Sequence, residues 1–243
     1  MYGSRARIGR INPSPETVGD EEWRRLMPDG VIVVSTRMFI ERVDPEGLTT
    51  MVTNVERAAR ELATARPNVI LMAGTAGAFN GGLNFDVELS RRIERASGGI
   101  PGTTTMTAVL EALRVLQIRK VAVATSYIPS VDEALAAVLT ASGIEVAAIK
   151  GMNILKSIDM GDVQPEATYH FAREIFQSAP DADGYFISCG NLRALEAIAR
   201  LEHDFGKPVI TSNQAGLWHA LRLAGVKAHH PALPLGGRLF AIA

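Results

Sequence analysis

Short apolar runs alternate with amphipathic, helix-like stretches from one end of the 243-residue chain to the other. Several of these runs contain almost no polar residues, which is typical of parallel strands that helices cover on both faces. Strands that alternate with helices predict an α/β fold built on parallel sheets. The predicted strands are residues 7–12, 31–36, 68–73, 103–105, 120–125, 144–149, 184–188 and 208–211. The predicted helices are residues 49–65, 85–96, 109–116, 131–141, 165–178 and 192–205.

The order of these segments is repeated once along the chain. Ala112-Leu113-Arg114 is matched by Ala220-Leu221-Arg222, 108 residues later, and Gly30 is matched by Gly143, 113 residues later. A drift of a few residues is what loop insertions produce, so we predict a duplicated unit rather than a chance similarity between two halves. The prediction is two pseudo-symmetric Rossmann-like lobes, each with a four-stranded parallel sheet flanked by helices. The predicted lobes are residues 1–105 plus 214–243, and residues 106–213.

Two such lobes would face each other across a cleft. Ligands of open parallel sheets bind beyond the carboxyl ends of the strands. The predicted active site is therefore the cleft where four strand-end loops converge. These loops are residues 13–17, 74–82, 126–130 and 189–191.

Composition narrows the class of ligand. Lys and Arg number 25 against 26 Asp and Glu, which gives no electrostatic basis for binding nucleic acid or an anionic membrane. A single cysteine excludes an intrachain disulfide and a cysteine-based zinc site, and the five histidines show no metal-ligand spacing. No signal peptide or run of 18 apolar residues is present. We expect a cytoplasmic protein that binds a small molecule without metal or cofactor; the oligomeric state stays open.

Cys189 follows the apolar run at residues 184–188 and precedes the helix predicted from Leu192. A thiol at a strand-to-helix turn faces free N–H groups and the positive end of the helix dipole. Its pKa can fall from about 8.5 to roughly 3.5–7.5 there, which makes it a proton donor or a nucleophile. The alternative is that Cys189 is a small apolar core residue.

Two further strand ends carry polar groups. The segment 74–82 is glycine-rich and contains Thr75, so backbone and hydroxyl donors can approach a ligand closely. It lacks the dinucleotide and P-loop motifs, and such a donor set without a lysine suits a carboxylate or an enediolate. The alternative is a connection that binds nothing. Tyr127 could donate into the cleft or simply fill the lobe interface.

The repeat places Gly74 opposite Cys189, and this asymmetry limits the chemistry. Two-base racemisation needs an acid on each face of the reacting carbon, whereas this chain has a thiol on one face only. A single thiol can protonate a carbanion from one side, or can add to a double bond.

The chain resembles the aspartate/glutamate racemase superfamily, and within it the group of arylmalonate decarboxylases and maleate cis–trans isomerases. The combination of Gly74-Thr75 with a single Cys189 is typical of the decarboxylase branch, because racemases and isomerases carry a cysteine at both places. The resemblance covers nearly the whole length. The stretches that carry it are residues 8–14, 43–47, 71–75, 121–127, 188–190 and 208–216.

This resemblance implies cofactor-free and metal-free decarboxylation of (aryl)malonate-type disubstituted dicarboxylic acids. Cys189 would protonate one face of the enediolate. The groups implied to hold the carboxylate are Thr75, Tyr127, the backbone N–H groups of Ala76, Cys189 and Gly190, and the turn at Gly74. The residues implied to form the substrate pocket are Pro13, Ile40, Val43, Leu48 and Met160.

The sequence departs from the decarboxylase pattern at two of these positions. Ala76 stands where the family has a serine, and Leu48 stands where it has an aromatic residue. Residues 12–17 and 35–38 are closer to the isomerases, for whose dicarboxylate substrate Arg37 is a candidate ligand. A maleate-type isomerase or racemase relative, and a carboxylate-binding protein without turnover, therefore stay as alternatives.

Overall fold

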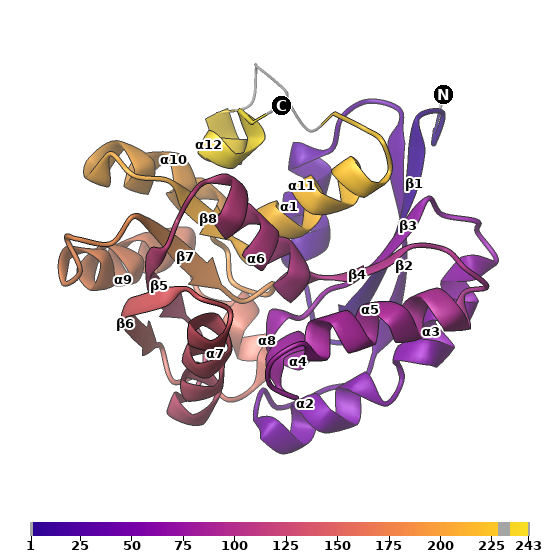
Figure 1. Ribbon diagram of the computed structural model, residues 1–243, viewed down its shortest axis with the longest axis horizontal. Coiled ribbons are helices and arrows are strands. Elements are labelled where there is room, and N and C mark those ends of the chain that lie inside the picture. The colour runs from indigo at the N-terminus through magenta and orange to yellow at the C-terminus, as the bar shows by residue number, and fades with distance from the viewer. Residues whose placement is uncertain (1, 228–233, 243) are drawn as a thin grey trace.

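The computed structural model describes residues 2–227 and 234–242; residues 1, 228–233 and 243, which belong to the segments predicted for the first lobe, lie outside it. Eight parallel strands form two four-stranded sheets (Figure 1). The first sheet has the order β2-β1-β3-β4 and the second has the corresponding order β6-β5-β7-β8, which confirms the predicted architecture. The strands are β1 (Ala6–Pro13), β2 (Val31–Met38), β3 (Val69–Met72), β4 (Gly102–Thr104), β5 (Lys120–Thr125), β6 (Glu145–Gly151), β7 (Gly184–Ser188) and β8 (Val209–Thr211).

Helices cover both sheets. In the first sheet α3, α5 and α11 pack on β3, and α1 packs on α11. In the second sheet α9 and α10 pack against one another and against the strands. None of the helices among residues 2–227 and 234–242 is long and apolar enough to cross a bilayer. The helices are α1 (Gly19–Leu26), α2 (Pro45–Val52), α3 (Val55–Ala63), α4 (Thr75–Phe79), α5 (Phe85–Ala96), α6 (Thr105–Val115), α7 (Pro129–Ala141), α8 (Ser157–Gly161), α9 (Pro165–Gln177), α10 (Leu195–Phe205), α11 (Ser212–Leu223), the 3₁₀ turn η1 (Pro234–Gly236) and α12 (Gly237–Phe240).

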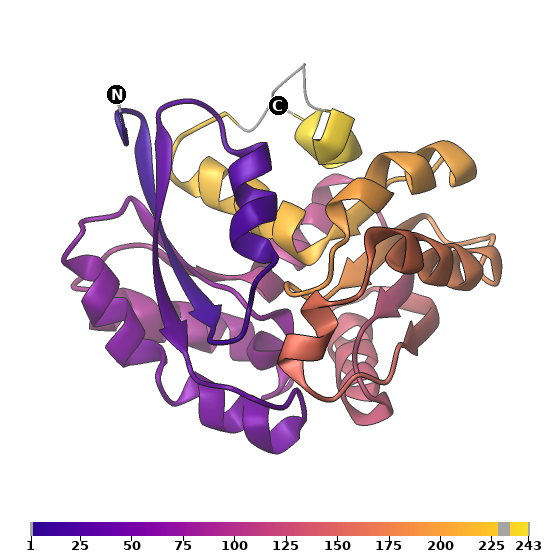
Figure 2. The same cartoon turned by 180° about the vertical axis from the view of Figure 1, so that it is seen from behind.

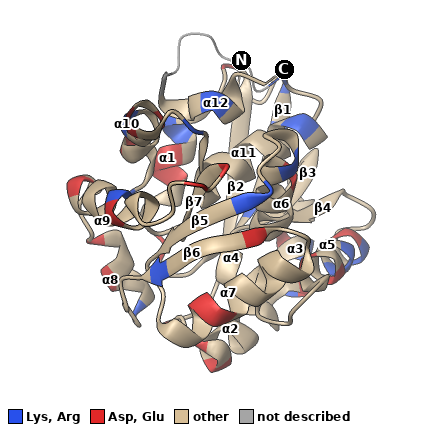
Figure 3. Ribbon diagram, turned by 60° about the vertical axis from the view of Figure 1, so that its left-hand side comes forward, with Lys and Arg blue, Asp and Glu red and all other residues tan. Residues whose placement is uncertain are grey.

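Burial differs between the strands, and the edge strand β8 is buried throughout like the middle strands β3 and β7. Every residue of β3 and β7 is buried, whereas the edge strands β2 and β6 alternate or stay half-exposed. Continuous apolar runs therefore mark the centre of each sheet, as expected where helices cover both faces. On the face shown in Figure 3, charged residues of both signs lie interspersed on the outer helices.

The strand registers fix which residues of the two halves correspond. Val69 pairs with Ile8 in the first sheet, and Gly184 pairs with Val121 at the same place in the second. Counting five residues on from Val69 and from Gly184 leads to Gly74 and Cys189. The predicted correspondence of these two positions is therefore confirmed by the pairing.

The last helix of each repeat reaches the other half. Helix α6 follows β4 but also packs on β8, and α11 follows β8 but also packs on β3 (Figure 1). Both helices begin in the same way, because the Thr104 and Thr211 hydroxyls accept the N–H groups of Thr107 and Gln214. The division into residues 1–105 plus 214–243 and residues 106–213 stays a prediction.

Some helix boundaries differ from the sequence prediction. The helix predicted over residues 49–65 is two helices, because the Thr53 hydroxyl bonds the Thr50 carbonyl and Asn54 leaves the helical conformation. The helix predicted from Leu192 begins only at Leu195. Helix α1 was absent from the prediction, and the glycine-rich segment contains the short helix α4.

Candidate active site

One pocket lies at the carboxyl ends of both sheets and encloses about 390 Å³ of empty space, its mouth included. It brings together every residue predicted for the site. These are Pro13, Ile40, Val43, Leu48, Gly74, Thr75, Ala76, Tyr127, Met160, Cys189 and Gly190. The pocket is also lined by residues that the sequence did not single out as candidates, namely Glu16, Met51, Gly77, Ser157 and Asn191.

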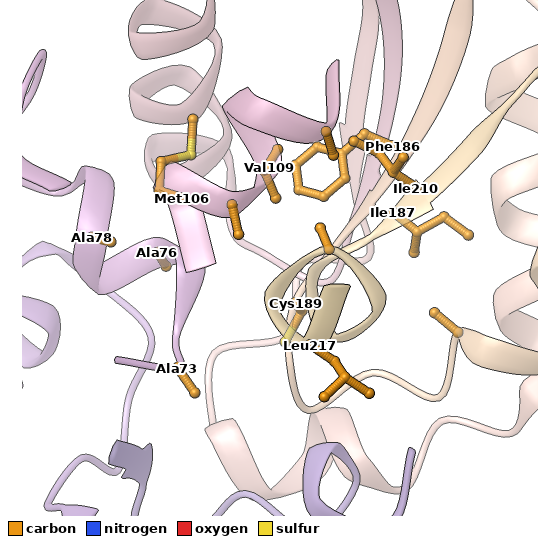
Figure 4. Close-up of a cluster of buried hydrophobic side chains, with 14 of the residues drawn as sticks. Ala73, Ala76, Ala78, Met106, Val109, Phe186, Ile187, Cys189, Ile210 and Leu217 are labelled. Carbon is orange, nitrogen blue, oxygen red and sulfur yellow. The ribbon is translucent and has the colours of Figure 1, made fainter. Parts of the chain in front are cut away.

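Cys189 stands one residue beyond β7 and is buried, with 8% of its surface exposed. Its φ of +138° lies in a region that side chains rarely adopt, and Gly74 at the corresponding place has a φ of +96°. Both halves thus make the same sharp strand exit, at which glycine is unstrained and cysteine is not. Figure 4 shows Cys189 with Ala76 and Ala78 of α4 in the buried cluster between the two halves.

The expected low pKa of the thiol is wrong. Burial raises the pKa of Cys189 to about 11, although the Ser126 hydroxyl and the N–H groups of Asn191 and Leu192 act in the opposite direction. Helix α10 begins six residues after Cys189, at Leu195, so its dipole is too distant to stabilise a thiolate. At neutral pH the sulfur therefore keeps its proton, and Sγ lies 3.6 Å from Sδ of Met160.

Ser212 joins the two strand exits. The Thr75 hydroxyl donates to Ser212 Oγ at 2.8 Å, and the Cys189 N–H donates to the same oxygen at 3.1 Å. Two of the donors expected for a carboxylate are thus held by Ser212 in this structure. The first-turn N–H of Ala76 in α4 has no intrahelical acceptor within reach, as is general for helix starts.

Tyr127 is fixed at both its ends. Its N–H donates to Thr125 Oγ1 at 3.0 Å, and that hydroxyl donates to Asp132 at 2.5 Å. Its phenol oxygen lies 3.2 Å from Ser188 Oγ, and its ring packs edge-on to Phe79. Burial, together with Cys189 nearby, raises the pKa of Tyr127 well above its usual value, so the phenol is a neutral hydrogen-bond donor.

The opposite wall is apolar and is closed by a strap. Ile40, Val43, Leu48, Met51 and Met160 are all buried there. We call residues 39–44 and 155–157 the strap. An isolated antiparallel bridge between Arg42 and Lys156 joins the two segments near α8 (Figure 2), and Ile40, Val43 and Ser157 of the strap line the pocket. The strap is held by Val43 N–H to the Leu155 carbonyl at 2.8 Å and Ser157 N–H to the Glu41 carbonyl at 2.9 Å.

A buried network holds the turn after Cys189. Asn213 Nδ2 donates to the Gly190 carbonyl and to Glu22 Oε2, both at 2.8 Å. Glu22 Oε1 accepts the N–H groups of Ala194 and Leu195 at 2.9 Å each. Helix α1 of one half is thereby tied to the turn of the other. Burial raises the pKa of Glu22 from 4.5 to about 7, against the effect of these donors.

This carboxyl should make stability depend on pH. Because its folded pKa is raised, the contribution of Glu22 is complete below about 4.5 and is lost as pH rises through 7. Such a rise in pKa corresponds to about 2.5 kcal/mol of unfolding free energy between pH 5 and pH 8. Urea unfolding at both pH values should show this fall in the wild-type protein and a smaller one in Glu22→Gln. Equal falls in the two proteins would contradict the assignment; Asp132, with its pKa raised to about 6, contributes equally to both.

Arg37 does not line the pocket. Its guanidinium donates to the backbone carbonyls of Ser14 and Glu16 and contacts Asp20. Arg37, the candidate ligand of an isomerase substrate, therefore supports the β1–α1 loop instead.

The sequence contains only weak indications of the residues that its analysis missed. Ser212 and Asn213 lie in the stretch 208–216 that carried the family resemblance, just after the N-cap Thr211. Glu16 lies in a loop already predicted to line the cleft. Only their burial and their contacts with distant segments separate them from ordinary loop residues.

Comparisons with known proteins identify the family and match the fold. A model of the family described as arylmalonate decarboxylase matches residues 8–240. The arylmalonate decarboxylase of Bordetella bronchiseptica is 36% identical, over 96% of this chain and 95% of its own. A maleate isomerase of Nocardia farcinica is 30% identical, over 96% and 94% of the two chains. The solved structure of a liganded arylmalonate decarboxylase variant, 35% identical, covers 98% of this chain and 100% of its own with a TM-score of 0.91. This chain belongs to the arylmalonate decarboxylase family.

Proposed function

We propose that this protein is a cofactor-independent decarboxylase of disubstituted malonates. The observation that carries the proposal is the thiol of Cys189 on one side of the pocket, with Gly74 at the corresponding place on the other. Burial raises the pKa of this thiol, which favours its protonated form. A protonated thiol suits the delivery of a proton. Its high pKa disfavours the thiolate that addition to a maleate double bond requires.

The proposed reaction has two steps. One substrate carboxylate lies against the Tyr127 phenol, the N–H groups of Ala76 and Gly190, and the Thr75 hydroxyl, which turns from Ser212 Oγ to donate to the substrate. The other carboxylate lies against the apolar wall. The bond from the central carbon to the second carboxylate breaks, CO₂ leaves, and the electron pair delocalises into an enediolate. Cys189 Sγ then gives its proton to the central carbon, and the thiolate recovers a proton from solvent.

The two walls favour this outcome for opposite reasons. Preorganised donors stabilise the charge that builds up on the enediolate. A carboxylate against Ile40, Val43 and Leu48 is poorly solvated and becomes neutral CO₂. Ala76 offers only its backbone N–H where the family has a serine, so the hydroxyl donors of this proposal are those of Thr75 and Tyr127.

A substrate panel tests the proposal. The purified protein is incubated separately with phenylmalonate, 2-methyl-2-phenylmalonate and maleate, and each reaction is followed by proton NMR. We expect CO₂ loss from at least one malonate and no fumarate. Fumarate from maleate would favour the isomerase alternative, and no turnover at all would favour a carboxylate-binding protein.

The product of 2-methyl-2-phenylmalonate adds a stereochemical readout. Protonation from the side of Cys189 alone should give one enantiomer of 2-phenylpropanoate in excess, measured by chiral chromatography. A racemic product would contradict the one-sided delivery of the proton.

A further inference from the structure

Glu16 is a buried carboxyl group on the pocket wall for which the mechanism above has no use. It lies in the loop after β1 and is 3% exposed. Its Oε1 forms an ion pair with Nη2 of Arg10 at 2.7 Å, whereas its Oε2 has no hydrogen-bond partner among the described residues. Its Oε2 lies beside Gly190, 3.4 Å from the position that a Cβ atom on that residue would take. An unpartnered polar group at this depth needs a partner, and the pocket supplies the space for one.

The charges around Glu16 offset only part of the effect of its burial. Arg10 of β1 also binds Asp20 of α1 at 2.5 Å, so its charge is shared between two carboxyl groups. Arg37 of β2 contacts Asp20 as well, and Cys189 after β7 is the titratable group on the far side. Burial raises the pKa of Glu16 more than Arg10 lowers it. The Glu16 carboxylate is therefore protonated more readily than that of a solvent-exposed glutamate.

The position beside Gly190 decides what each form of Glu16 would do. Under the proposed function, on which this inference rests, the Gly190 N–H faces a substrate carboxylate. An ionised Glu16 would repel that group in a site of low dielectric. A neutral carboxylic acid would instead donate an O–H to it, and a hydrogen bond to a charged acceptor is among the stronger ones.

We propose that Glu16 is a further substrate-binding residue, which donates a hydrogen bond from its neutral carboxylic acid to the carboxylate held beside Gly190. It adds a side-chain donor to a pocket in which Ala76 offers only its backbone. The pocket then selects an anionic carboxylate over a neutral group of the same shape.

The test measures binding and needs no turnover. The probe is phenylacetate, which has no second carboxylate to lose, and its neutral isostere phenylacetamide is the comparison ligand. Affinities are measured by calorimetry at pH 6.5 for the wild-type protein, Glu16→Gln and Glu16→Ala. Glu21→Gln is the matched control, because Glu21 is an exposed residue of α1 that pairs with Arg24.

We expect Glu16→Gln, which keeps a donor, to bind phenylacetate within about threefold of wild type. Glu16→Ala should bind it at least about tenfold more weakly, with phenylacetamide binding unchanged. Weaker binding of both ligands would show structural damage instead and overturn the proposal. Four other results would also overturn the proposal. These are tighter phenylacetate binding in both variants, an equal loss of phenylacetate affinity in both, an unchanged affinity in both, and no phenylacetate binding by the wild-type protein. A protein that shows the expected pattern but decarboxylates nothing would refute the proposed function alone.

Discussion

Cys189→Ala should lower kcat for malonate decarboxylation by about 10³-fold, because a positioned general acid contributes roughly 10²–10⁴ in rate. The thiol sits at the end of β7 with its proton retained at neutral pH. Alanine keeps the Cβ and the same backbone conformation at a φ of +138°, so folding should change little. The measurement is CO₂ release under saturating substrate, with the melting temperature as a check on folding.

Cys189→Ser is the matched control for shape. A hydroxyl is a far weaker acid than a thiol, so this variant should be nearly as slow as the alanine variant although it fills the same space. The KM of both should stay within about threefold of wild type, since the donors that bind the carboxylate are intact. Retention of more than a tenth of wild-type kcat by Cys189→Ala would rule out Cys189 as the proton donor.

Tyr127→Phe should lower kcat by about 10²–10³-fold, the usual cost of removing one donor from an oxyanion site. The phenol is buried, stays neutral and is directed by the Thr125–Asp132 contacts below it. Because the enediolate carries more negative charge on its two oxygens than the substrate carboxylate does, the effect should fall on kcat more than on KM. Steady-state kinetics with the best substrate of the malonate panel measure both.

Tyr169→Phe removes the same hydroxyl at a place without a role in the pocket. Tyr169 of α9 donates to Asp204 near the surface of α10. Its loss should leave kcat within about twofold of wild type. If Tyr127→Phe behaves like Tyr169→Phe, the phenol only fills the junction of the two halves, which was the alternative interpretation from the sequence.

The architecture could be predicted because its signals are local and occur twice. The uninterrupted apolar run of β7 and its counterpart β3 mark the centres of two sheets, and the matched Ala-Leu-Arg runs mark α6 and α11. The break at Thr53–Asn54 was missed because helical periodicity continues through it. Helix α1 was missed because it is short and highly charged.

The residues predicted for the site line one pocket, but their electrostatics could not be predicted. A strand-to-helix turn suggested a stabilised thiolate, whereas the helix begins late and burial dominates the pKa of Cys189. Burial of a single atom depends on segments far apart in the chain, as with Asn213, which bonds Glu22 and Gly190. The same holds for Glu16, whose environment is set by β1, α1 and the turn after β7.

The strap has a consequence for the pace of the catalytic cycle. Its two backbone hydrogen bonds, Val43 to Leu155 and Ser157 to Glu41, connect segments from opposite halves, and Ile40, Val43 and Ser157 of these segments line the cavity. This wall of the cavity therefore cannot widen between the two halves without breaking both bonds. A substrate too large for the cavity would have to break them to enter, and its turnover would then be limited by that opening rather than by cleavage of the carbon–carbon bond.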